Sequence, residues 1–184
     1  MKILALDIGN VCVKIDFNNF ARNLHIPEIP PELIALQREM ECGRINDEEF
    51  FSTAEKLLHR SKNECIDAFN KILISPVDGI GEVVSALKQY GFEARFFSDI
   101  SVTHLQRTGE LFPEAALVPD GIFSFSAGAQ KPDEAMFAAF ERSFGLPALY
   151  TDDRMELIEA ARERGWNAVQ FTSAENLQQL IADL

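Results

Sequence analysis

The segment Ile3-Leu4-Ala5-Leu6-Asp7-Ile8-Gly9-Asn10 decides how the rest of the chain is interpreted. A short apolar run bounded by turn-forming residues is typical of a buried strand. We therefore predict a strand over residues 3–6 that ends at Asp7, with a chain break at Gly9 and Asn10. A strand that is apolar along its whole length is expected inside a parallel sheet, where both faces are covered.

The second half of the chain alternates between strand-like and helix-like patterns. Strands are predicted at residues 93–98, 121–125, 148–151 and 166–171. Helices are predicted at residues 80–90, 102–107, 136–144 and 155–164, and a last helix after the capping pattern Thr172-x-x-Glu175. Strands that alternate with helices predict an α/β fold, in which a parallel sheet has helices on both faces.

Residues 17–75 show only short helical patterns and cannot belong to that sheet. Asn46 with Glu49, and Ser61 with Glu64, resemble capping boxes at the start of two helices. We interpret this segment as a small all-helical cap inserted after the first strand. The predicted division is a core domain of residues 1–16 and 76–184 and a cap domain of residues 17–75.

Ligands of an open parallel sheet bind beyond the carboxyl ends of its strands. The predicted strands end at Asp7, Ser98 and Asp152, with Asp153 adjacent, and Lys131 stands just ahead of a predicted helix. Taken alone, each of these residues has an ordinary explanation as a helix cap or a surface group. Their joint occurrence, in this order and on this pattern of elements, is far more specific.

These residue types are suited to phosphoryl transfer. A carboxylate is a competent nucleophile toward phosphorus and forms an aspartyl-phosphate. A magnesium ion held by carboxylates cancels the repulsion between the nucleophile and a dianionic phosphate. A serine hydroxyl and backbone N–H groups bind phosphate oxygens, and a lysine supplies fixed positive charge for the group being transferred.

Four short motifs in this order resemble those of the haloacid dehalogenase (HAD) superfamily. The motifs are Leu6-Asp7-Ile8-Gly9-Asn10-Val11, Phe96-Phe97-Ser98-Asp99, Gln130-Lys131-Pro132-Asp133 and Leu149-Tyr150-Thr151-Asp152-Asp153. The resemblance covers the whole chain and is greatest to a branch of sugar-phosphate phosphatases, such as α-glucose-1-phosphate phosphatase, with a small helical cap. It implies a Rossmann-like core of three layers.

The resemblance also implies roles for individual residues. Asp7 would be the nucleophile, and Asp7, the carbonyl of Gly9, Asp152 and Asp153 would hold Mg²⁺, Asp153 directly or through water. Asn10, Ser98, Asp99 and Lys131 would bind the substrate, and Ser98 and Lys131 would hold its phosphoryl group. The substrate would be a small phosphorylated metabolite. Specificity would come from the cap, through side chains within residues 16–22 and 38–44.

The chain departs from the family pattern at several positions. Gly9 stands where most phosphatases of the superfamily carry a second aspartate as general acid and base, although the resembling branch shares this glycine. The departure predicts slow turnover, or a substitute such as Asp16 or a water. Asp99 replaces the usual asparagine, and its charge would repel phosphate unless a group such as Arg154 neutralises it. Leu157 replaces a supporting asparagine.

Three functions from different classes remain open at this stage. The first is a magnesium-dependent phosphatase acting on a small phosphomonoester. The second is a haloacid dehalogenase, which uses the same aspartate without a metal, so that the pair Asp152-Asp153 argues against it. The third is a catalytically weak or inactive relative that binds a phosphorylated ligand or a protein partner, and Gly9 and Asp99 support it.

Composition narrows the partners. The 184 residues carry 17 lysines and arginines against 29 aspartates and glutamates, a net charge of −12. This acid excess argues against nucleic-acid binding and against anionic membranes. Three scattered cysteines, with no CxxC pair, favour reduced thiols over a zinc site or a disulfide framework. We predict a cytoplasmic protein, and the oligomeric state is left open.

Overall fold

A parallel sheet of five strands, in the order β5-β4-β1-β6-β7, forms the centre of the computed structural model, which describes residues 1–184. The strands are β1 (Lys2–Leu6), β4 (Phe92–Ser98), β5 (Gly121–Phe123), β6 (Leu149–Asp152) and β7 (Ala168–Gln170). Strand β1 lies between β4 and β6 and pairs in parallel with both. The predicted α/β fold with a parallel sheet is therefore confirmed.

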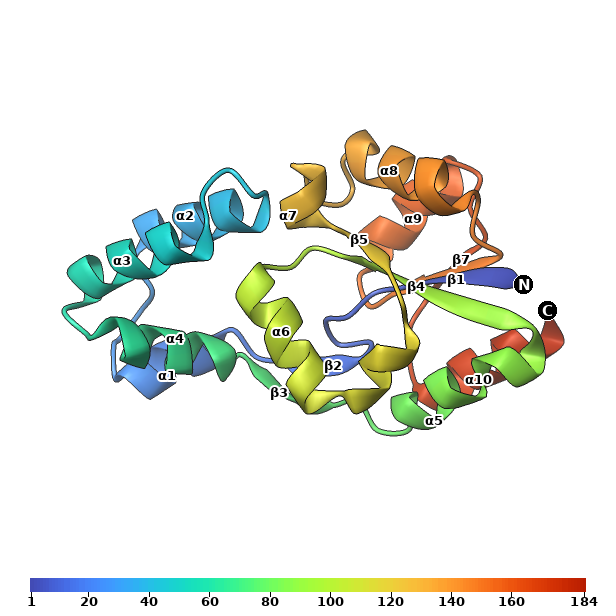
Figure 1. Cartoon of the computed structure of the whole chain (residues 1–184), viewed down its shortest axis with the longest axis horizontal. Coiled ribbons are helices and arrows are strands. Elements are labelled where there is room, and N and C mark those ends of the chain that lie inside the picture. Colours follow the sequence, from blue (N-terminus) through green and yellow to red (C-terminus); the bar gives the residue numbers. More distant parts are fainter.

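Helices cover both faces of this sheet and complete three layers (Figure 1). Helices α5 (Ile80–Ala86), α6 (Val102–Leu111) and α10 (Ala174–Asp183) lie on one side, and α8 (Glu134–Phe144) and α9 (Met155–Glu163) on the other. A short helix α7 (Ser124–Ala127) follows β5, and 3₁₀ turns occupy Leu87–Tyr90 and Pro113–Leu117. No helix combines the length and the apolar character that crossing a bilayer requires.

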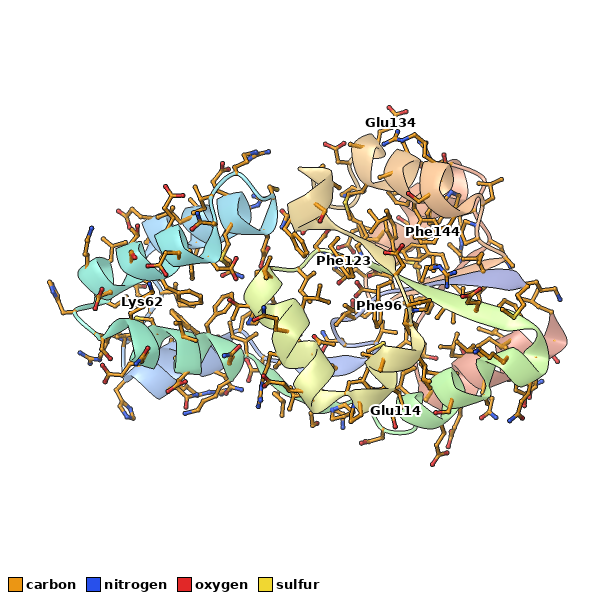
Figure 2. The ribbon with its side chains drawn as sticks, in the orientation of Figure 1. Lys62, Phe96, Glu114, Phe123, Glu134 and Phe144 are labelled. Atoms are coloured by element: carbon orange, nitrogen blue, oxygen red, sulfur yellow. The ribbon has the colours of Figure 1, made fainter.

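The alternation of side chains along β1 explains why its sequence is apolar throughout. Leu4 and Leu6 pack into the larger core cluster with α5 and α10, whereas Ala5 packs into the smaller cluster with α8 and α9. Neighbouring positions on β4 divide in the same way, with Phe96 in the larger cluster and Phe97 in the smaller. Figure 2 shows Phe96 next to Phe123 of β5, with ring centroids 6.4 Å apart.

Four helices form a group beside the sheet, at the left of Figure 1. They are α1 (Asn18–Leu24), α2 (Pro31–Glu41), α3 (Asp47–Leu58) and α4 (Lys62–Asn70). An antiparallel ribbon of β2 (Val13–Ile15) and β3 (Leu73–Pro76) leads into and out of the group. This ribbon was not predicted from the sequence, which showed only helical patterns over residues 17–75. Strands of three and four residues are too short to show a reliable period.

The capping predictions were right for the helix starts inside this group and wrong for the last helix. Ser61 and Glu64 form a full capping box, and the Asn46 side chain accepts a hydrogen bond from the Glu49 N–H. The last helix is capped by Ser173 rather than Thr172. Strand β7, which precedes the last helix, covers Ala168–Gln170 and is shorter than the predicted strand of residues 166–171. Strand β5 ends at Phe123 and not at residue 125, because the chain turns into α7 at Ser124.

Contacts from α3, from α4 and from the turn after α2 help to dock the helical group on the sheet layers. Gly43 packs against the backbone of Phe125. The Asp47 carboxylate accepts hydrogen bonds from the Thr103 N–H, at 2.7 Å, and from the Thr103 hydroxyl. The His104 ring stacks on Phe69 with centroids 3.9 Å apart. His104 is buried and serves as a packing residue at this contact.

We expect Gly43→Ala to lower the free energy of unfolding by about 2–4 kcal/mol, from left-handed strain plus overpacking. Gly43 has a φ of +67°, and a Cβ atom there would lie 2.1 Å from the carbonyl oxygen of Phe125. Gly128→Ala is the matched control, because Gly128 has a φ of +74° but open space around its Cβ position. Urea unfolding of both variants separates the strain from the clash. Equal losses would contradict the docking role of Gly43.

Because His104 is buried, we expect the protein to lose stability in mild acid. Burial lowers the pKa of His104 from 6.5 to about 4, although the Phe69 carbonyl, 2.9 Å from Nε2, opposes the shift. The unfolded state therefore binds the proton first, and stability falls as the pH drops from 6.5 toward 4. Between pH 7 and 5 this amounts to about 2 kcal/mol. The measurement is the free energy of unfolding at pH 7 and at pH 5. The difference between the two values should be smaller in His104→Gln than in the parent by this amount, and an equal difference in both proteins would contradict the prediction.

Candidate active site

Lys131 joins two strand-end carboxylates at the buried centre of the site. Its ammonium donates hydrogen bonds to Asp7 Oδ1 at 2.9 Å, Asp152 Oδ2 at 2.6 Å and the Phe97 carbonyl at 2.9 Å. Asp7 follows β1 and Asp152 ends β6, so the parallel pairing of these strands places both at one sheet edge. Lys131 precedes α8 and reaches this edge with a fully buried side chain. The structure therefore brings together three residues predicted from distant parts of the chain.

The pKa values of the two carboxyls respond differently to this environment. Burial raises the pKa of Asp7 from 3.8 to about 6, with Lys131 acting in the opposite direction. Burial also acts to raise the pKa of Asp152, but Lys131 and the hydrogen bonds from the Arg154 N–H and Tyr150 outweigh it and lower the pKa. The two carboxylates hold the pKa of Lys131 above its ordinary value despite its burial. Lys131 therefore stays charged.

Asp153 adds a third carboxylate and gives the site the donors of a hard cation. One oxygen each of Asp7, Asp152 and Asp153 lies within 4.8 Å of the others. Burial raises the pKa of Asp153, although its Oδ2 accepts a hydrogen bond from Asn10 Nδ2 at 3.0 Å. Asn10 adopts a φ of 53°, and its own Oδ1 accepts from the Ile15 N–H. A set of carboxylate oxygens at this spacing fits Mg²⁺.

The charge of Asp99 is neutralised, which resolves one departure from the family pattern. Asp99 Oδ2 accepts a hydrogen bond from the Arg154 guanidinium at 3.1 Å, and Oδ1 accepts from the Lys131 N–H at 2.9 Å. The carboxylate is therefore engaged by a cation and by the backbone of the lysine that lies at the site. Ser98 is buried at the end of β4, and it lines the cavity described next.

A cavity of about 410 Å³ opens above the strand ends. Its walls include the predicted residues Asp7, Gly9, Asn10, Ser98, Asp99, Lys131 and Asp153. Asp152 is fully buried beneath it and does not line it. From the helical group and its connection to the sheet come Phe17, Arg38 and Glu41. The sequence had marked residues 38–44 as facing substrate but could not single out Glu41, because helix periodicity does not show which partner a polar face meets.

Asp16, considered from sequence as a substitute acid, is placed elsewhere. It does not line the cavity. Its Oδ1 accepts a hydrogen bond from the Asn18 N–H at 2.9 Å, and its Oδ2 pairs with Arg22. The Asn18 N–H holds the pKa of Asp16 below its ordinary value, so the side chain is a carboxylate at neutral pH. The structure thus assigns Asp16 to the start of α1 and not to proton donation.

The parallel sheet with a helical group inserted after its first strand is the fold of the haloacid dehalogenase superfamily. A HAD family enzyme from Bacteroides thetaiotaomicron, solved as a magnesium complex, superposes with a TM-score of 0.85 over 98% of both chains at 18% identity. The same enzyme with magnesium and inorganic phosphate gives a TM-score of 0.79 over 98% of both chains at 17% identity. A putative β-phosphoglucomutase from Thermotoga maritima gives 0.66 over 100% of both at 12%.

Comparison by sequence alone finds no related protein. No protein-family profile matches the chain, and no curated protein matches it. The likeness to the solved structures therefore confirms the predicted fold, while the roles of the individual residues stay predictions.

Proposed function

We propose that this chain is a HAD-superfamily phosphatase that hydrolyses a small phosphomonoester with Mg²⁺, sugar phosphates being the first candidates. The observation that carries the proposal is the contact of Lys131 with Asp7 and Asp152, with Asp153 beside them. This arrangement would provide a nucleophile, its counter-charge and a set of cation ligands at one sheet edge. The cavity of about 410 Å³ suits a small-molecule substrate.

In the proposed reaction, an oxygen of Asp7 attacks the phosphorus atom. The bond from phosphorus to the alcohol oxygen breaks, and an aspartyl-phosphate forms. Lys131 and the Ser98 hydroxyl hold phosphoryl oxygens in this proposal, because both residues line the cavity together with Asp7. Water then attacks the same phosphorus, releases inorganic phosphate and restores the Asp7 carboxylate. Arg154 keeps Asp99 from repelling the substrate.

Asp7, the carbonyl of Gly9, Asp152 and Asp153 would hold Mg²⁺. When bound, the ion supplies positive charge that offsets the repulsion between Asp7 and the phosphate oxygens. The three carboxylates fit this assignment because their oxygens cluster within 4.8 Å. The dehalogenase alternative has no use for such a cluster, which favours the phosphatase.

The test is hydrolysis of an aryl phosphate and a panel of sugar phosphates, with magnesium and with excess chelator. We expect magnesium-dependent release of inorganic phosphate that exceeds the background of Asp7→Asn. Phosphate release no faster than that background would overturn the proposal. Ligand binding without turnover would favour the binding-protein alternative, and chloride release from a haloacid in chelator would favour the dehalogenase.

A further inference from the structure

Cleavage of an alkyl phosphate needs a proton donor that the sheet edge does not supply. The departing alkoxide is a strong base, so a positioned acid accelerates its departure. Gly9 has no side chain, although a Cβ there would lie 3.9 Å from Asp7 Oδ2. The donor therefore has to come from another carboxyl of the cavity. Four line it: Asp7, Glu41, Asp99 and Asp153.

Three of these four are committed to other contacts. Asp7 is the proposed nucleophile and is paired with Lys131. Asp99 is paired with Arg154, and protonation of its carboxyl would cost that ion pair. Asp153 belongs to the cluster that would hold the cation. Asp7 and Asp99 are each held by a cationic side chain in the structure, and Asp153 would be held by the cation when Mg²⁺ is bound.

Glu41 differs because it belongs neither to an ion pair nor to the carboxylate cluster, and its hydrogen-bond partners are neutral amides. At the end of α2, its Oε1 accepts a hydrogen bond from Gln37 Nε2, and its Oε2 accepts one from Gln130 Nε2, both at 2.8 Å. These bonds orient the carboxyl from the helical group and from the loop before Lys131. No lysine, arginine or histidine nitrogen lies within 4.0 Å, since no ion pair involves this residue.

The surroundings of Glu41 favour a carboxyl that can exchange a proton. Burial raises the pKa of Glu41, Asp99 acts in the same direction, and the Gln37 and Gln130 amides and Arg154 oppose the shift. Arg38, one turn earlier on α2, and Lys131 line the same cavity, and Cys42 follows directly in the chain. The Cys42 thiol has a raised pKa through burial and stays neutral.

We infer that Glu41 is the proton donor to the leaving alcohol, an inference that rests on the proposed phosphatase function. As Asp7 Oδ bonds to phosphorus, the bond from phosphorus to the alcohol oxygen breaks. The Glu41 O–H proton passes to that oxygen, which leaves a free alcohol and the Glu41 carboxylate. In the second step the carboxylate takes a proton from the attacking water, the bond from phosphorus to Asp7 breaks, and inorganic phosphate departs.

The position of Glu41 also defines the substrate class. Glu41 lines the cavity from the end of α2, whereas Asp7 lines it from the end of β1, so the alcohol half of the substrate would lie on the α2 side. A positioned acid matters more for phosphates of unactivated alcohols, such as sugar hydroxyls, than for p-nitrophenyl phosphate, whose departing oxygen is a much weaker base.

The experiment compares Glu41→Gln with the parent on glycerol 2-phosphate or a hexose phosphate and on p-nitrophenyl phosphate. For the alkyl ester we expect kcat/KM to fall by about 10²–10⁴-fold, the usual contribution of a general acid. For the aryl ester the fall in kcat/KM should be at least tenfold smaller. In the parent, kcat/KM for the alkyl ester should decline with rising pH as the general acid loses its proton, and the variant should lose this decline. Glutamine preserves the size of the side chain, and thermal unfolding checks that it folds.

Glu39→Gln is the matched control, because Glu39 is on the same helix but pairs with Arg44 and does not line this cavity. Equal losses on both esters, or no loss on the alkyl ester, would overturn the role of Glu41 and leave the phosphatase function standing. A parent that hydrolyses neither ester, with magnesium present, would overturn the proposed function and this inference with it.

Discussion

Asp7→Asn is expected to reduce the hydrolysis of every phosphate ester by at least about 10⁴-fold, the scale seen when a nucleophile is removed. An amide oxygen cannot form the aspartyl-phosphate, and no neighbouring carboxylate is free to replace it. Asp152 is fully buried, and Asp99 is paired with Arg154. The measurement is phosphate release under saturating magnesium, followed by trapping of the phosphorylated enzyme in the parent.

The same variant should fold at least as well as the parent when no metal is present. Burial raises the pKa of Asp7 to about 6, so the folded state binds more protons than the unfolded state between pH 3.8 and 6. The contribution of Asp7 to stability is present below this window and is lost as the pH rises through it. At neutral pH the folded parent carries the free-energy cost of an ionised, buried Asp7 carboxylate, and the neutral amide of Asp7→Asn removes this cost. If Asp7→Asn is inactive but as stable as the parent, the loss of activity comes from the missing nucleophile and not from misfolding.

Asp78→Asn serves as the control for Asp7→Asn. Asp78 has a side chain that is 93% exposed and pairs with Lys14, and neither residue lines the cavity. Its replacement should leave phosphate release unchanged. If Asp7→Asn retained more than a tenth of the parental rate, the nucleophile would have to be sought elsewhere.

Lys131→Met is expected to have the largest effect on stability. The variant leaves Asp7 and Asp152 buried without the cation that now contacts both. Breaking a buried ion pair by removing one partner costs about 3–5 kcal/mol. Activity should fall as well, by about 10²–10³-fold, because the phosphoryl group loses a fixed positive charge. Urea unfolding in chelator, at several pH values, measures the stability term.

The destabilisation by Lys131→Met should depend on pH in a defined direction. Without the lysine, burial raises the pKa of both carboxyls in the folded state above their values in the unfolded state. The folded variant then binds more protons than its unfolded state. Its loss in free energy of unfolding relative to the parent is therefore small below pH 4 and grows as the pH rises to 7. Lys14→Met removes an exposed partner of Asp78 and should cost less than about 1 kcal/mol. Equal losses for the two lysine variants at pH 7 would contradict the buried ion-pair network.

Much of the site could be predicted because it follows the sheet. Asp7, Ser98 and Asp152 end their strands, and strand pairing places these ends at one edge. Lys131 belongs to no strand, so it was noted for its place just ahead of a predicted helix, and the resemblance of its motif implied its role. The hydrogen bonds that neutralise Asp99 could not be foreseen, because they join Arg154 and the Lys131 N–H, which are distant in the chain.

The sequence by itself determined the parallel sheet, the inserted helical segment and the chemistry gathered at the strand ends. Local patterns carry this information, because burial on both faces of β1 and helix periodicity are visible in short windows. Only the tertiary structure decided that Glu41 faces the cavity while Asp16 does not. The direction of a helix face depends on contacts such as Gly43 with Phe125, and no local pattern records a contact between residues so far apart in the chain.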